Sequence, residues 1–204
     1  MRNSFPLFSN PIDLAHIIWK LHLPSNPLII DATVGNGQDT LFLADLANNL
    51  NGQLIGIDIQ KQAIDSTQSK LIEHPSLLRR VQLFHQSHAT FPSMINPESV
   101  DLIVYNLGYL PGADKSITTL SSSTIESVRN GLNLIKAGGI ISITCYPGHE
   151  EGFHEYNALI AYTQTFDKKI YGITKHEWVN RKSSPILLLI QKNTPLQARS
   201  ATVI

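Results

Sequence analysis

The sequence predicts an α/β fold of the doubly wound, nucleotide-binding type, with a mostly parallel sheet. Three observations carry this prediction. The apolar run 28–30 is typical of a buried strand, and Asp31 and a turn containing Gly35 and Gly37 follow it. Short apolar runs then alternate with helical patterns along the chain. Two late strand candidates, 170–176 and 186–191, suit an antiparallel hairpin that closes a seven-stranded sheet.

Residues 1–27 are expected to form an N-terminal helical cover before a main domain at 28–193, with a loose C-terminal tail at 194–204. The helical spacing of 12–23 places Leu14, Ile17, Ile18 and Leu21 on one side, which predicts the buried face. Two histidines in this helix, His16 and His22, lack a partner cluster, so we do not expect them to bind metal.

The loop after the first strand is expected to bind a nucleotide-type ligand, and the sequence features that it lacks indicate which ligand. Thr40 stands where a dinucleotide fingerprint has its third glycine, and the loop has no lysine of a phosphate loop. The carboxylates of Asp31 and Asp39 would repel a pyrophosphate but suit a ligand with an ammonium and a sulfonium, such as S-adenosylmethionine (SAM). Asp39 or Thr40 is the expected N-cap of a helix over 41–50. The alternative is an ordinary βαβ turn with no ligand.

A second strand, 53–57, ends at Asp58, which follows Gly37 by 21 residues. This is the spacing at which an acidic residue accepts hydrogen bonds from ribose hydroxyls. A helix over 61–73 and a third strand over 81–85 come next. Ser87 and His88 follow that strand and could bind an adenine, although a plain polar turn explains them equally well.

The fourth strand, 100–105, continues into Asn106 and, three residues later, Tyr109. This arrangement is similar to the Asn-Pro-Pro-Tyr loop of amine methyltransferases, with Leu-Gly in place of Pro-Pro. Asn106 would accept hydrogen bonds from a target amine, and Tyr109 would stack on a planar base. The alternative is a turn with a core tyrosine. The long loop that follows contains Asp114 and Lys115 and is typical of a functional segment.

The rest of the domain contains a helix over 124–136 that Ser122, Ser123 or Thr124 would cap and that Gly138–Gly139 would end. A fifth strand over 140–145 and a helix over 150–166 follow. The only cysteine, Cys145, excludes an internal disulfide and is expected to be packed rather than nucleophilic. His149 lies at the end of the fifth strand and, with Asp114, is a candidate base for removing a proton from an amine.

Composition limits the possible partners. The net charge of zero argues against a large non-specific nucleic-acid surface, but it permits a local basic patch. Residues 166–182 form one, with five Lys or Arg against two acids. Trp178 and Tyr171 stand among these bases, as in single-strand recognition. The alternative is a hairpin edge that its lysines protect from pairing with another strand.

No apolar stretch is long enough to span a membrane and no secretion signal is present, so we expect a cytoplasmic protein.

Four motifs together resemble the family long labelled "putative rRNA methylases": D-A-T-V-G-N-G-Q-D-T, D-I-Q, H-Q-S-H and N-L-G-Y-L-P-G-A-D-K-S-I-T-T. The resemblance spans about residues 28–192, and Ala113 departs mildly from the usual glycine. It implies a Rossmann-like class I SAM-dependent methyltransferase that methylates the aminomethyl group of the wobble uridine in tRNA, forming 5-methylaminomethyl-2-thiouridine. It also implies cofactor contacts at Asn36, Asp39, Asp58, Gln60, Ser87 and His88.

The expected site has three parts. The cofactor site comprises Asp31, Thr33, Gly35, Asn36, Gly37, Asp39, Thr40, Asp58, Gln60, Ser87, His88 and Asn106. The catalytic candidates are Asn106, Tyr109, Asp114 and His149. The tRNA anticodon loop would cross Lys115, Trp178, Arg181 and Lys182. No metal and no membrane partner is expected, and a homodimer is left open. Methylation of rRNA or of another base, a non-catalytic SAM- or RNA-binding module and a nicotinamide oxidoreductase remain the alternatives.

Overall fold

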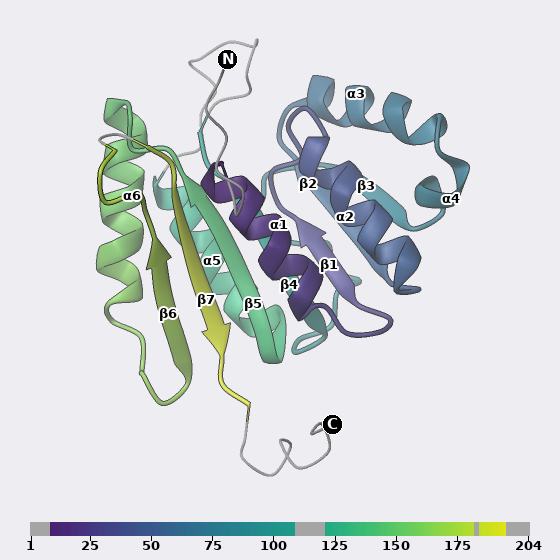
Figure 1. The fold of residues 1–204 in the computed structure, drawn as a ribbon. Helices are drawn as coiled ribbons and strands as arrows, with labels where there is room; N and C mark the ends of the chain where they lie inside the picture. The colour runs from purple at the N-terminus through teal and green to yellow at the C-terminus, as the bar shows by residue number, and fades with distance from the viewer. Residues whose placement is uncertain (1–8, 109–120, 182–183, 195–204) are drawn as a thin grey trace.

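The computed structural model describes residues 9–108, 121–181 and 184–194 of this chain. The strands of this part form one seven-stranded sheet in the order β3-β2-β1-β4-β5-β7-β6 (Figure 1). All neighbouring strands from β3 to β5 are parallel, while β7 runs antiparallel to both β5 and β6. The predicted fold class and its closing hairpin are therefore confirmed. The strands are β1 (Leu28–Asp31), β2 (Gln53–Asp58), β3 (Val81–His85), β4 (Val100–Asn106), β5 (Ile135–Cys145), β6 (Tyr171–His176) and β7 (Ile186–Lys192).

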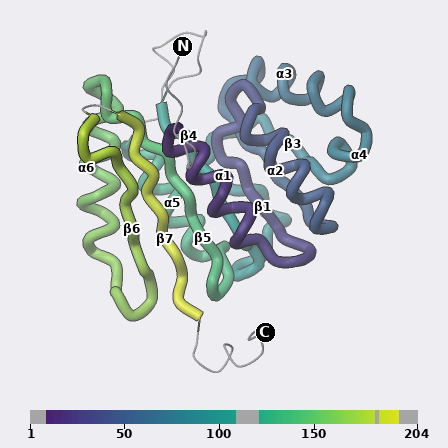
Figure 2. The backbone as a smooth tube through the Cα atoms, viewed as in Figure 1, coloured from purple at the N-terminus to yellow at the C-terminus, as the bar shows by residue number. Residues whose placement is uncertain are grey.

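Helices cover both faces of the sheet, as expected for buried parallel strands. They are α1 (Pro11–His22), α2 (Gln38–Asn49), α3 (Lys61–Ile72), α4 (Pro75–Leu78), α5 (Ser121–Leu134) and α6 (Glu150–Thr163). Side chains from α1 to α4 join one apolar cluster and side chains from α5 and α6 join the other. Successive side chains of a strand point to opposite faces of the sheet and so join opposite clusters, as Ile29 and Ile30 of β1 do. Figure 2 shows the β6–β7 hairpin at one edge of the sheet, with β3, α3 and α4 at the opposite edge.

The strand order reverses between β1 and β4, and this reversal places the site. The chain continues from β1 toward β2 and β3, whereas β4 continues toward β5 on the other side. Asp31 at the end of β1 pairs with Val104, two residues before the end of β4. In open parallel sheets, a ligand binds in the crevice at such a switch point. The carboxyl ends of β1 and β4 therefore lie side by side at the edge where such a ligand would bind.

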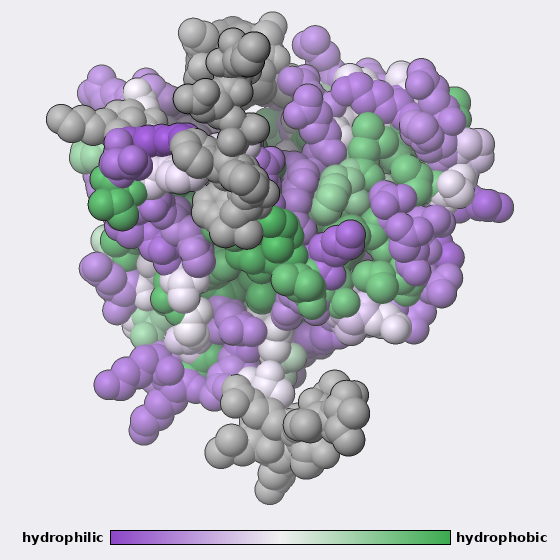
Figure 3. Space-filling view, viewed as in Figure 1, coloured by the Kyte–Doolittle hydropathy of each residue, from purple (hydrophilic) through white to green (hydrophobic). Residues whose placement is uncertain are grey.

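The buried face of α1 is only partly as predicted, because Leu14 and Ile18 pack against the core but the other two predicted residues do not. Ala15 and Trp19 are buried, while Ile17 and Leu21, expected in the core, are 38% and 81% exposed. Figure 3 shows hydrophobic side chains gathered over this region of the surface. The prediction is wrong at these two positions because it counts only aliphatic side chains as the buried face and omits Trp19. Its large side chain is 1% exposed and fixes the rotation of the helix by donating a hydrogen bond to Ser142 of β5.

Two helix boundaries also differ. Helix α2 begins earlier than predicted, with Gly37 at its N-cap, because the side chains of Asp39 and Thr40 bond to other elements instead of capping. Helix α5 covers Ser121–Leu134, so the predicted capping residues at 122–124 lie inside it. The glycines expected to end this helix, Gly138 and Gly139, belong to β5.

Strand β5 begins earlier than predicted because Ile135 pairs with Val100 of β4 before a register shift. A Cβ on Gly139 would lie 2.9 Å from the Val100 carbonyl oxygen, so the close approach of the two strands requires glycine there. The other differences are small: α3 and α6 end one and three residues early, and α4 was not predicted. Within the described ranges, no helix is both long and apolar enough to cross a membrane.

Candidate active site

The glycine loop after β1 is compact and held by backbone hydrogen bonds. Gly35 and Gly37 have φ angles of +54° and +75°, which few other residues adopt. The Gly37 N–H donates to the Val34 carbonyl at 2.9 Å. A Cβ on Gly37 would lie only 2.4 Å from Oγ1 of Thr67, a buried residue of α3. The loop therefore requires glycine at position 37 for both its conformation and its packing.

Asp58 holds this loop from the end of β2. One carboxylate oxygen accepts the Gly35 N–H at 2.8 Å, and the other accepts the Gln60 N–H at 2.8 Å. Burial is the main cause that raises the pKa of Asp58, and these two backbone donors oppose the rise. Each carboxylate oxygen keeps further acceptor capacity, so the group can still accept a pair of hydroxyls. The ribose contact of Asp58 stays a prediction.

Asp31 is buried beneath the glycine loop, and its predicted cofactor contact stays a prediction. Its side chain is fully buried, and its oxygens accept the Thr40 hydroxyl at 2.6 Å and the Thr33 N–H at 3.2 Å. Burial, joined by the charges of Asp39 and Asp58, raises the pKa of Asp31 to about 7, although the two hydrogen bonds lower it. Asp31 and Thr40 therefore shape the floor of the loop.

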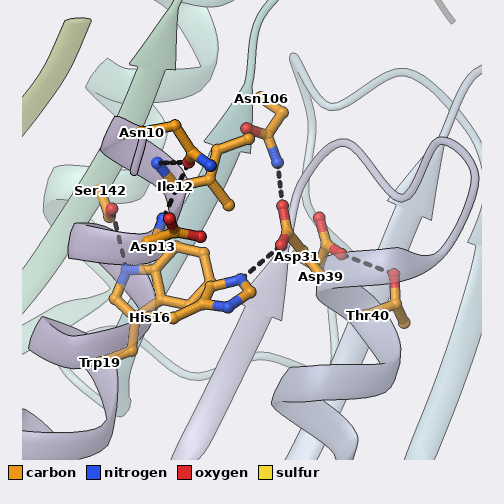
Figure 4. Close-up of polar contacts among 10 residues, drawn as sticks. All are labelled: Asn10, Ile12, Asp13, His16, Trp19, Asp31, Asp39, Thr40, Asn106 and Ser142. Carbon is orange, nitrogen blue, oxygen red and sulfur yellow. Dashed lines mark hydrogen bonds and ion pairs between the residues drawn. The ribbon is translucent and has the colours of Figure 1, made fainter. Parts of the chain in front are cut away.

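A chain of three polar side chains connects the loops after β1 and β4 (Figure 4). Asp39, in the first turn of α2, accepts a hydrogen bond from Nδ2 of Asn106. Its other oxygen lies 2.6 Å from Nε2 of His16 in α1. The backbone N–H of Asn106 donates to Oγ1 of Thr33 at 2.6 Å. The Oδ1 atom of Asn106 is buried and has no hydrogen-bond partner among the described residues.

His88 provides a second buried polar atom without a partner. Its side chain packs edge-on against Tyr105 with the ring centroids 6.0 Å apart, and burial lowers its pKa to about 4. The imidazole is therefore neutral near pH 7, and its Nδ1 has no partner in the described part of the chain. Ser87, next to it, accepts the Ala89 N–H at 3.2 Å. The adenine contacts expected of Ser87 and His88 stay predictions.

The loop after β5 lies beside the loop after β4. A Cβ on Gly108 would contact the ring of Tyr146, and burial together with the charge of Asp39 raises the pKa of Tyr146 to about 12. The sequence reading missed Tyr146, although its position just after a strand was a usable signal. His149 caps α6, with Nδ1 accepting the Gly152 N–H at 3.1 Å, so a base role would fall to its Nε2.

Cys145 is buried, and burial together with the charge of Glu155 raises its pKa to about 12, so the expectation of a packed thiol is confirmed. Four predicted residues lie outside the described residues: Tyr109, Asp114, Lys115 and Lys182. Among the described residues, no group of three His, Cys, Asp or Glu side chains could hold a metal ion.

The described basic side chains of the predicted patch are exposed, and its two aromatic side chains are half-buried. The Arg181 guanidinium lies 4.0 Å from the centroid of the Trp178 ring, in the connection between β6 and β7. Tyr171, counted with the patch, tilts onto Phe166 at 5.4 Å and packs one side against the core, and its proposed stacking role stays a prediction.

The comparisons with known proteins agree with this geometry. The model of a family described as "Putative rRNA methylase" matches residues 54–192. A chloroplastic tRNA (mnm(5)s(2)U34)-methyltransferase of Arabidopsis thaliana is 33% identical over 188 residues, covering 88% of this chain and 68% of that protein. The chain belongs to the rRNA methylase family.

Solved structures extend this likeness to the cofactor. The crystal structure of a protein from Clostridium thermocellum that is described as a "putative rRNA-methylase" is 34% identical, covers 90% of this chain and 97% of its own, and superposes with a TM-score of 0.84. A methyltransferase from Streptococcus mutans in complex with SAH is 29% identical, covers 90% and 98%, and has a TM-score of 0.79. The protein is therefore a SAM-dependent methyltransferase of the rRNA methylase family.

The residues at the switch point fit this cofactor. The glycine loop removes side-chain bulk beside the strand ends, and Asp58 has acceptor capacity for hydroxyls. Two buried polar atoms have no partner among the described residues, one on His88 just after β3 and one on Asn106 at the end of β4. The carboxylate of Asp39 suits a cationic ligand. The likeness to known proteins tests none of these residues individually, so their cofactor contacts stay predictions.

Proposed function

We propose that this protein methylates the aminomethyl group of the wobble uridine in tRNA, converting 5-aminomethyl-2-thiouridine to 5-methylaminomethyl-2-thiouridine. RNA methylation in general is supported by the family and by the chloroplastic relative. The main support for an amine as the target is the buried Oδ1 atom of Asn106, which has no hydrogen-bond partner among the described residues. A primary amine donates N–H bonds, and Oδ1 can only accept them.

The geometry around Asn106 fixes which of its two amide groups faces a substrate. Asp39 is a carboxylate and only accepts hydrogen bonds, so the amide NH₂ of Asn106 must face it. Oδ1 then points away from Asp39 (Figure 4). The backbone bond from Asn106 to Thr33 holds the residue against the glycine loop. An N–H donor bound to Oδ1 would therefore lie close to the cofactor loop.

When bound, SAM supplies an electrophilic methyl group on its sulfonium. The contribution of the chain is to hold the nitrogen lone pair in line with that methyl group, which can account for most of the rate. A primary alkylamine resembles lysine, with a pKa of about 10.4, and must lose a proton before it can attack. Burial beside a cation lowers that pKa. His149 and Asp114 remain the candidate bases, the first through Nε2 because Nδ1 caps α6.

The decisive experiment gives the protein SAM and tRNA from cells that lack this methylation, followed by nucleoside mass spectrometry. We expect 5-aminomethyl-2-thiouridine to gain one methyl group, while rRNA from the same cells gains none. Asn106→Ala should lower kcat by about a hundredfold, the usual cost of a misplaced reacting group. Asn49→Ala, an exposed asparagine of α2, serves as the matched control. Methylation of the rRNA alone would refute the proposed substrate.

We further propose that the anticodon loop crosses the β6–β7 connection. Arg181 stacks over Trp178 there, and a base can stack on an aromatic side chain for about 1–3 kcal/mol. Lys175 on the same hairpin is exposed and forms an ion pair with Glu177 at 3.0 Å. The proposed path depends on Trp178, Arg181 and the neighbouring Lys182.

The double variant Arg181→Ala, Lys182→Ala tests this path. Phosphate contacts to a single strand each contribute about −0.7 to the slope of log affinity against log salt, so the slope should flatten by about one unit. Affinity for tRNA should fall, and affinity for SAM should not change. The control is Lys61→Ala with Arg79→Ala, which removes the same charge at the opposite edge of the sheet. An unchanged salt slope in the hairpin variant would place the RNA elsewhere.

A further inference from the structure

His16 is the residue of the site that neither the family motifs nor the sequence reading assigns to it. It lies in α1, 23 residues before Asp39, and its Nε2 is 2.6 Å from Oδ1 of that carboxylate. The N-terminal helix therefore contacts the same carboxylate that holds Asn106. Because no local motif connects the two residues, only the packing of α1 against α2 brings them together.

Two aromatic side chains fix the orientation of the His16 ring. Phe42, one turn after Asp39 in α2, stacks on it with a centroid distance of 3.9 Å and an interplanar angle of 8°. Trp19, one turn later in α1, tilts against it at 5.0 Å. Trp19 is itself anchored, because its Nε1 donates to Ser142 at 2.9 Å. The imidazole is thus held with its Nε2 edge toward Asp39 by contacts from both helices.

The two oxygens of Asp39 have separate partners, and this separation determines the orientation of Asn106. His16 bonds to Oδ1, while Oδ2 accepts the Asn106 amide NH₂ (Figure 4). If the carboxylate of Asp39 moved away, the Asn106 NH₂ would lose its acceptor, and the amide could turn over and present NH₂ instead of Oδ1. An NH₂ group cannot accept a hydrogen bond from an amine. The contact with His16 opposes this movement, since it holds the other carboxylate oxygen in place.

We propose that His16 is a positioning residue for methyl transfer. It holds Asp39 so that Asp39 keeps Oδ1 of Asn106 directed at the target amine. The helix α1 is then a part of the active site and not merely a cover. The proposal rests on the proposed function, because it takes Asn106 as the acceptor of the substrate amine.

Two substitutions separate the hydrogen bond of His16 from its ring packing. His16→Phe keeps a ring that can stack on Phe42 but removes the N–H donor. His16→Gln loses the stacked ring but keeps a donor at the end of its side chain, at about the reach of Nε2. A merely structural role predicts that the Phe variant is the more stable and the more active. The positioning role predicts that the Phe variant is the more stable but the less active.

Turnover of undermodified tRNA is the first readout. His16→Phe should lower kcat by about tenfold or more, because orientation of the reacting amine is lost. Its KM for tRNA should stay within about twofold, since phosphate contacts supply most RNA affinity. Its Kd for SAM, measured by calorimetry, should likewise not change. His16→Gln should retain most of the wild-type kcat while its melting temperature falls. Equal kcat for wild type and His16→Phe, or equal losses in both variants, would overturn the proposal.

The side-chain NH₂ signal of Asn106 in a ¹H–¹⁵N spectrum is the second readout and needs no substrate. Asn106→Ala identifies the signal by its disappearance. We expect the signal to move in His16→Phe and to remain near its wild-type position in His16→Gln. This readout separates the two proposals: if wild type does not methylate the uridine, the proposed function fails while the signal still reports on His16. An unmoved signal in His16→Phe refutes the positioning role whatever the substrate.

Discussion

Asp31 provides a test of the electrostatics beneath the glycine loop. Its carboxylate is fully buried and accepts bonds from Thr40 and Thr33. Burial is the largest cause that raises its pKa from an ordinary value of 3.8 to about 7. In the unfolded chain, the same group would ionise near its ordinary value. The native protein therefore keeps a proton on Asp31 over a pH range in which the unfolded chain has lost it.

This difference makes folding less favourable as the pH rises. Between about pH 4 and pH 7, unfolding releases the proton of Asp31, so the free energy of unfolding falls with increasing pH. Each unit of pKa difference corresponds to 1.36 kcal/mol, so the full effect reaches about 4 kcal/mol at most. Below this pH range Asp31 is protonated in both the native and the unfolded state. Above it, Asp31 is charged in both states, and the native state is destabilised by the full effect of burying that charge.

Asp31→Asn removes the titration and keeps an oxygen that can accept the Thr40 hydroxyl. Urea unfolding of both proteins at several values from pH 4 to pH 8 gives the difference in unfolding free energy. As the pH rises across this range, we expect the unfolding free energy of the wild type to fall by several kcal/mol relative to that of Asp31→Asn. Thr40→Val removes a bond that lowers the pKa of Asp31, so it should extend the loss to higher pH. A difference that stays constant from pH 4 to pH 8 would refute the reasoning.

Two further predictions concern the loop itself. Gly37→Ala should destabilise folding by at least about 1–2 kcal/mol, because its φ of +75° disfavours a Cβ. Adding Thr67→Ala should recover only the part of the lost stability that comes from the clash with Thr67. Chemical unfolding measures the stability of both variants, and an unchanged unfolding midpoint for Gly37→Ala would contradict the loop geometry. Asp58→Ala should weaken SAM binding by about 1.5–3 kcal/mol in calorimetry, the value of hydrogen bonds to a charged group. Wild-type affinity in a folded Asp58→Ala protein would remove Asp58 from the cofactor site.

The local order of elements could be predicted because its signals are local. The apolar run at 28–30, the two glycines of the loop and the acidic residue at position 58 each act through neighbouring backbone. Parallel strands end at the same edge of a sheet, so residues after successive strands were expected to meet there. The sheet order and the closing hairpin confirm that expectation.

The predictions that failed depend on contacts between distant segments. Gly138 and Gly139 are typical of a helix end, but pairing of Ile135 with Val100 draws this segment into β5. Asp39 is a good N-cap residue by type, yet it bonds to His16 and Asn106 instead. Tertiary pairing overrides local preference in both places, since it satisfies more backbone and side-chain groups than a local cap does.

Periodicity and glycine act within a few residues, so the sequence alone predicts the fold class, the glycine loop and the place of Asn106 at the carboxyl end of the fourth strand. Only the tertiary structure decided which amide atom of Asn106 is available. That depends on Asp39, and Asp39 depends on His16, which reaches it through the packing of α1 against α2. Such a chain of side chains has no fixed spacing in sequence, because each link is set by the distance between helices and strands that fold from separate parts of the chain.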